Sequence, residues 1–180
     1  MKLSKLVLSL TLGVALVSGS ALADTATFTR AETGTLAAVA NIDIGEILVS
    51  KVALNKTQNK GVITLAKMMV TQHSSNLTQI LSMGDDQKKL SRALNKGVAE
   101  DLAEANNHDL TTLGALEGSK FDYAYVDAMV SGHEAALKLI DDKLMKSAES
   151  DQMKKFLTDT RATVVKHLDA AKALQKEMQS

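Results

Sequence analysis

The stretch SKFDYAYVDAMVSGHEAALKLIDDKLMK, residues 119–146, shows most clearly how this chain folds. Its apolar residues recur every three or four positions, which is the repeat of one face of an α-helix. We expect Ser119 to cap the start of this helix, with Asp122 in the favourable first turn. The face that the spacing predicts to be buried carries Val126, Met129, His133, Leu137, Ile140 and Leu144.

Three further stretches show the same repeat. They predict a first helix at about 35–56, a second from a cap at Asn59 to a stop at Gly84, and a fourth after a cap at Ser150. Residues 85–120 form a long connection with a weaker helix at about 98–116, which Gly118 ends. The pattern predicts an all-α four-helix bundle with an extra helical connection between helices two and three. Both a crossover and a simple up-down topology fit this spacing.

The composition agrees with long helices. The chain has no proline and no tryptophan, with only three phenylalanines and two tyrosines. Proline interrupts helices because it lacks a backbone donor and clashes with the preceding turn. A β-rich fold would need more aromatic residues and more turn signals. The composition therefore favours an all-α fold.

The first 23 residues have the order of a secretory signal peptide. Two lysines precede a short apolar run at 6–17, and the small-residue sequence ALA follows at 21–23. The run is shorter than the roughly 20 residues that span a bilayer. We expect cleavage near Ala23 and a helical domain at 24–180 that is periplasmic or otherwise exported. No second long apolar stretch follows, so no membrane span is expected in the mature protein.

Charge and cysteine content exclude several classes of function. Without Lys2 and Lys5, 19 basic side chains stand against 21 acidic ones. This balance offers no basic face for nucleic acid, so no nucleic-acid partner is expected. The chain has no cysteine, which removes disulfides and thiolate ligands from consideration.

Four polar residues fall where the pattern predicts a buried core. His73, His133 and His167 lie on the apolar faces of three different helices, and Glu46 lies among apolar neighbours of the fourth. Such groups are costly to bury without partners. Counted from the predicted turns at about 1.5 Å per residue, all four lie at similar depth. The positions predict a core site for one transition-metal ion (zinc, iron, manganese or copper) with these four ligands.

A short repeated motif leaves the identity of the metal ion undecided. Met-Val-x-x-His occurs at 69–73 and again at 129–133, which places thioether and imidazole on one helix face. This soft pair suits copper, whereas Glu46 with imidazole suits zinc, iron or manganese. Methionine also fills gaps in helical cores, and a core histidine can simply be hydrogen-bonded.

No enzyme motif accompanies these residues. The chain has no Gly-rich phosphate loop, no Gly-x-Ser-x-Gly and no His-Glu-x-x-His. The Glu-x-x-His pairs of di-iron carboxylate bundles are missing as well. No catalytic residue is therefore assigned.

The chain resembles a known family in several segments. These are Glu46-Ile47-Leu48, Met69-Val70-x-x-His73 with Asn76 and Leu77, the run 121–126 into Met129-Val130-x-x-His133, and His167-Leu168. Together they resemble an exported bacterial "domain of unknown function" family, often labelled predicted outer membrane protein. The resemblance covers about 28–178 and implies a ferritin-like bundle in the periplasm with unsettled activity. It also implies that Glu46, His73, His133 and His167 form a metal cluster. Members often carry an acidic residue where this chain has Gln72.

Two hypotheses follow from these patterns. The first is a periplasmic bundle that holds a metal ion in its core. The second is a non-catalytic envelope or stress-related protein, whose polar core residues hydrogen-bond to each other and whose surface binds a partner. Convergence of the four side chains on one point favours the first hypothesis.

Overall fold

The computed structural model describes residues 28–84 and 86–180, so the predicted signal peptide at 1–23 lies outside it. All secondary structure in these residues is helical. The long helices are α1 (Arg30–Lys56), α2 (Lys60–Met83), α4 (Val98–Gly114), α5 (Gly118–Leu139) and α7 (Asp151–Met178). The short elements are α3 (Gln87–Ala93), the π-helical turn η1 (Ile140–Leu144) and α6 (Met145–Ser147). None of the helices described is long and apolar enough to cross a membrane.

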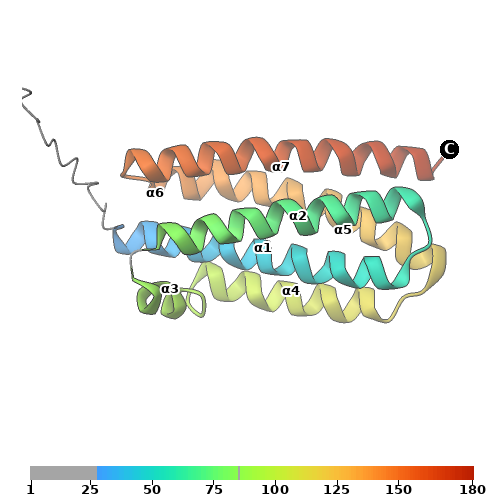
Figure 1. Cartoon of the computed structure of the whole chain (residues 1–180), viewed down its shortest axis with the longest axis horizontal. Helices are drawn as coiled ribbons and strands as arrows, with labels where there is room; N and C mark the ends of the chain where they lie inside the picture. Colours follow the sequence, from blue (N-terminus) through green and yellow to red (C-terminus); the bar gives the residue numbers. More distant parts are fainter. Residues whose placement is uncertain (1–27, 85) are drawn as a thin grey trace, which may run out of the picture.

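Helices α1, α2, α5 and α7 lie side by side along the long axis of the molecule, and α4 runs beside α1 (Figure 1). The chain passes along α1, returns along α2, and is then carried back by α3 and α4 before α5 begins (Figure 1). Helices α2 and α5 therefore run in the same direction. The predicted helical connection crosses over along the full length of the bundle, and α3 within it was not predicted.

Side-chain caps fix where most helices begin. Asn59 accepts hydrogen bonds from the amides of Gly61 and Val62, and Ser150 accepts one from Met153, which confirms both predicted caps. The predicted stop at Gly84 is confirmed as well. The start of the first helix was predicted too late, because a capping box of Thr29 and Glu32 starts α1 at Arg30.

The boundary between α4 and α5 differs from the prediction. Helix α4 ends at Gly114, before the predicted stop, and Gly118 instead opens α5 with φ of 59°, a conformation that favours glycine. Ser119 is not the cap, because Glu117 precedes the helix and makes no side-chain capping bond. Asp122 does not cap the helix either. It accepts a 2.5 Å hydrogen bond from Thr57 Oγ1, which ties α5 to the α1–α2 turn.

The bundle core consists of two apolar clusters. The first apolar cluster includes Leu36, Ile80, Ile140 and Phe156, and the second includes Met69, Phe121, Tyr125 and Met129. Between these clusters along the helices lie four buried polar residues, Asp43, His73, His133 and His167, beside the buried apolar residues Ile47 and Leu168. A polar layer therefore interrupts the apolar core at mid-length.

Candidate metal centre

Three histidines from three helices meet in the polar layer. His73 on α2, His133 on α5 and His167 on α7 expose only 4%, 2% and 0% of their surface. Their ring centroids lie 4.9 to 5.8 Å apart. One ring nitrogen from each histidine lies within 4.8 Å of those of the other two. The predicted convergence of the three imidazoles is present in the structure.

Asp43 on α1 fixes the protonation pattern of His73. Its two carboxylate oxygens accept hydrogen bonds from His73 Nδ1 at 2.8 Å and from Asn76 Nδ2 at 2.9 Å. His73 Nδ1 therefore carries the ring proton, and Nε2 is left as a lone pair. That Nε2 atom is buried and has no hydrogen-bond partner.

The other two rings are held in the same way. His133 Nδ1 lies 2.7 Å from the carbonyl oxygen of Met129, which can only accept, so this nitrogen donates. With the Gln72 amide oriented so that Oε1 faces the ring, His167 Nε2 is the donor of the 2.9 Å hydrogen bond between them. Each of the two rings therefore keeps one nitrogen lone pair, at His133 Nε2 and at His167 Nδ1. A metal-bound histidine almost always donates its second ring N–H in this manner.

The two nitrogens left over on His133 and His167 face each other. His133 Nε2 and His167 Nδ1 are 3.3 Å apart, and in these tautomers neither has a proton to share. Two nitrogens bound tetrahedrally to one ion, each about 2.05 Å from it, lie about 3.3 Å apart. Their separation matches one edge of a metal coordination tetrahedron. A tetrahedral set would place a nitrogen of His73 at about the same distance from both, whereas the separations among the three histidines reach up to 4.8 Å, so the His73 ring would have to move inward to complete it.

The environment favours the neutral form of His133 and His167. Burial, together with the charges that His73 and His133 would carry, lowers the pKa of His167 to about 3. Burial also lowers the pKa of His133, although Glu46 opposes this effect. An additional proton, held by an imidazolium form of either ring, is therefore a poor explanation for the close pair at neutral pH. Neutral imidazole is the form that binds metal ions.

Glu46 lies beside the cluster rather than within it. Its Oε1 atom is 3.9 Å from His133 Nδ1, the nitrogen that already donates to Met129, and its side chain is 13% exposed. Its Oε2 atom is buried without a hydrogen-bond partner. The structure therefore brings together three of the four residues predicted from the sequence, and places Glu46 on the outer side of His133.

Asp43 is the residue that sequence reasoning missed. From the sequence, Glu46 was predicted to be the carboxylate facing the core. Asp43 lies one turn before Glu46 on α1 and is 1% exposed. The available signal was its spacing, because Asp43 stands seven residues from both Leu36 and Ser50, which are buried on the same face. Met69 and Met129, the possible thioether ligands, pack in the second apolar cluster.

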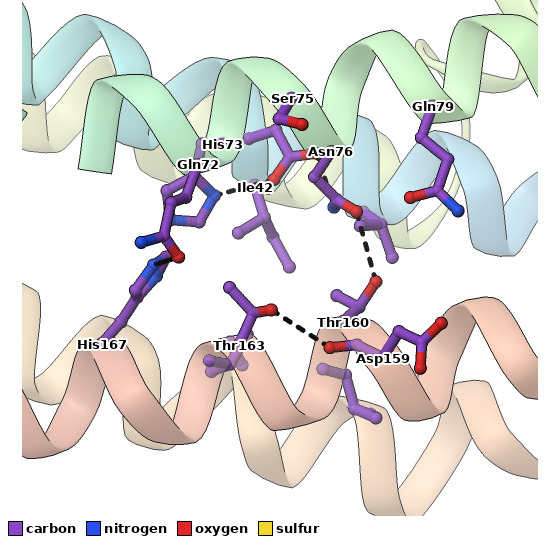
Figure 2. A pocket seen from close by; sticks show the side chains of 15 residues that line it. Ile42, Gln72, His73, Ser75, Asn76, Gln79, Asp159, Thr160, Thr163 and His167 are labelled. Carbon is purple, nitrogen blue, oxygen red and sulfur yellow. Dashed lines mark hydrogen bonds and ion pairs between the residues drawn. The ribbon is translucent and has the colours of Figure 1, made fainter. Parts of the chain in front are cut away.

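A pocket of about 210 Å³ adjoins the cluster between α2 and α7 (Figure 2). His73 and His167 line one end of it, and Ile42 lies on its floor. Two hydrogen bonds bridge the helices across it, from His167 to Gln72 and from Thr160 Oγ1 to Asn76 Oδ1 at 3.3 Å. Its charged lining residues other than histidine, Asp43 and Asp159, are both acidic. The pocket thus places open space and acidic side chains beside His73 and His167, whereas His133 does not line it.

Comparisons with known proteins identify the family but no activity. We found no significant match among curated proteins or among solved structures. A family model described as a domain of unknown function, DUF4142, matches residues 17–174 and so covers most of the chain, including all three histidines. The chain belongs to this domain of unknown function family, DUF4142.

Proposed function

We propose that the protein is an exported, ferritin-like helical-bundle protein that binds one transition-metal ion through His73, His133 and His167. The observation that carries this proposal is the hydrogen-bond pattern of the three rings. In these tautomers each ring donates its one N–H to a group outside the cluster: Asp43, the Met129 carbonyl or Gln72. The other nitrogen of each ring keeps a lone pair, and these three nitrogens are buried close together. Buried lone pairs without donors are costly, and a metal ion satisfies all three at once.

The donor set narrows the choice of ion. Imidazole nitrogen suits zinc, copper and iron, whereas manganese prefers more oxygen ligands. Three protein ligands also leave a coordination position free, as in zinc sites that bind water or an exogenous ligand. Glu46 could add an oxygen ligand only if its side chain turned toward the ion. A ligand set with that oxygen would suit iron and manganese better than three imidazoles alone do.

The alternative is a structural role in which the polar layer is only a hydrogen-bonded core and the surface binds a partner. The bonds from Asp43, Asn76 and Gln72 fit this view. The facing nitrogens of His133 and His167, and the unpartnered Nε2 of His73, do not. A structural network would satisfy these atoms, because low dielectric makes each missing bond expensive.

The direct test is metal analysis of protein purified from the periplasm, with His73→Ala and His133→Ala beside the wild type. Exposed His108 on α4 provides a matched control as His108→Ala. We expect about one ion per chain in the wild type and the control, and little in the other two. Zinc or copper at 100 times its dissociation constant should stabilise the wild type by about 2.7 kcal/mol.

Two outcomes would contradict the proposal in different ways. Equal and negligible metal in all four proteins, with no thermal shift on adding zinc or copper, would exclude the metal centre. Equal metal in all four proteins would show that the ion binds elsewhere. Fractionation of cells that express the full chain tests export separately, and a protein found only in the cytoplasm would exclude that part.

A further inference from the structure

A second pocket, of about 400 Å³, lies at the end of the bundle where α1 begins and α3 packs against it. Four of its seven lining residues are cationic, and none is acidic. We call it the basic pocket; it is lined by Phe28, Arg30, Thr33, Lys89, Arg92, Ala93 and Lys96. The chain as a whole has equal numbers of basic and acidic side chains, so this concentration of one charge is local.

The positive charges of the basic pocket are largely uncompensated. Within the described ranges 28–84 and 86–180, no carboxylate lies within 4 Å of the charged groups of Arg30, Arg92 or Lys96. Asp86 offsets part of this charge, because it pairs loosely with Lys89 at 3.7 Å and its carboxylate also interacts with the charge of Arg92. Elsewhere on the surface, by contrast, Arg161 holds Asp141 with two bonds of 2.7 and 2.8 Å. The basic pocket is therefore a place of mutual repulsion that a bound anion would relieve.

The backbone adds to this preference for an anion. Arg30 is the first residue of α1, where the partial positive charge of the helix dipole disfavours a cation. Lys89, Arg92 and Lys96 follow at intervals of three and four residues, which places them on one side of α3 and the turn after it. The start of α1 and the segment 89–96, which are far apart in the sequence, thus place their cationic side chains around the same basic pocket.

The side chains define the class of ligand. Two guanidinium groups can each hold two oxygens of a tetrahedral oxyanion, and two ammonium groups can neutralise its remaining charge. Phe28, which is 7% exposed, and Ala93 add apolar surface beside the cations, and the volume leaves room for an organic substituent. We propose that the basic pocket binds a phosphate group that carries an organic moiety, in a small phosphate ester or in the head group of an anionic lipid. This site is independent of the metal centre.

The test uses the purified protein without added metal, in a buffer free of phosphate. Calorimetric titrations with inorganic phosphate and with glycerol phosphate measure binding of the free anion. Sedimentation with vesicles of phosphatidylglycerol, compared with vesicles of phosphatidylcholine, measures binding of the lipid head group. Arg30→Gln, Arg92→Gln and the double variant remove cations from the pocket. Lys88→Gln is the matched control, because Lys88 is exposed on the same helix and does not line the pocket.

We expect one phosphate or glycerol phosphate per chain, with affinity lowered about tenfold or more by each arginine substitution and unchanged by Lys88→Gln. Binding confined to phosphatidylglycerol vesicles and lost in the double variant would support the lipid source instead. No binding in either arm would overturn the proposal, and so would equal binding by all variants, which is the result of diffuse surface attraction. Thermal melts of the variants should lie at or slightly above the wild-type midpoint, because the replaced side chains are exposed and their removal relieves repulsion.

Discussion

Two polar centres of this bundle are equally buried but differ in how completely their polar atoms are hydrogen-bonded. Glu32, at the end of the bundle, is 1% exposed and accepts four hydrogen bonds: from the amides of Thr29, Glu149 and Ser150 and from the hydroxyl of Ser150. The histidine cluster at mid-length keeps an unpartnered Nε2 on His73 and two facing nitrogens on His133 and His167. One centre is complete without a ligand, and the other is not.

The comparison shows how a structural centre can be told from a binding site. Glu32 closes the capping box of α1 and also holds the start of α7, so its bonds join two helix ends. Burial alone would raise its pKa, but the bonds from Ser150, Thr29 and Glu149 outweigh burial and hold the pKa below its usual value. In the histidine cluster the hydrogen bonds lead outward from each ring, and the inward atoms have no partner. Completeness of the bonding, rather than burial, separates the two roles.

The largest expected difference is in stability without metal. Glu32→Ala leaves four donors without their acceptor, and we expect unfolding free energy to fall by about 3 kcal/mol. His133→Leu combined with His167→Leu replaces two polar groups by apolar ones of similar size, and the change should stay within about 1 kcal/mol. Urea unfolding of the metal-free proteins measures both. Glu149→Ala is the control, because that exposed side chain lies in the same turn and its backbone amide remains.

A large loss of unfolding free energy in the double leucine variant would show that the histidine cluster stabilises the fold. The distinction between it and the Glu32 centre would then not hold. A loss in Glu149→Ala as large as in Glu32→Ala would show that the turn, and not the carboxylate, stabilises this end of the bundle.

Sequence periodicity predicted the long helices, and it predicted that His73, His133 and His167 face the core, for a clear physical reason. Helices α2, α5 and α7 each bury one main face, so their apolar stripes locate His73, His133 and His167 correctly. Helix α1 packs against both α2 and α4, and six successive residues at 36–41 are buried. No single apolar stripe exists on such a helix, so the apolar pattern did not separate Asp43 from Glu46, and only the spacing of Asp43 from Leu36 and Ser50 pointed to it.

Other features depend on contacts that no local pattern contains. Gln72 was noted only as a departure from the family, and the structure shows that its amide holds His167. The basic pocket joins Arg30 to the segment 89–96, and a near-neutral total charge concealed it. The start of α1, by contrast, follows from a local capping box, the Thr-x-x-Glu pattern at 29–32, which was present in the sequence but was not used.

A second prediction concerns how Asp43 supports the proposed ion. Asp43→Asn keeps an acceptor for His73 but removes the negative charge, so zinc affinity should fall by about 10- to 100-fold. The measurement is competition titration with a zinc-binding dye. Exposed Asp101→Asn on α4 is the control and should bind as the wild type does. Glu46→Gln sharpens the result, because a loss as large as that of Asp43→Asn would place Glu46 at the ion. An unchanged affinity in Asp43→Asn would contradict its role in orienting His73.

The smallest expected effect is the pH dependence of the Glu32 centre. Because the pKa of Glu32 is lower in the folded protein, its carboxylate contributes stability above the unfolded-state pKa of about 4.3. This contribution is lost as the pH falls through the folded-state pKa. The difference in unfolding free energy between wild type and Glu32→Gln should therefore be constant near neutral pH and should narrow below about pH 4.3. Because both proteins contain the same histidines, the pH dependence due to histidine cancels in this difference of unfolding free energies. A difference that does not change with pH would mean that the amide replaces the carboxylate in every bond, and that charge adds nothing to this centre.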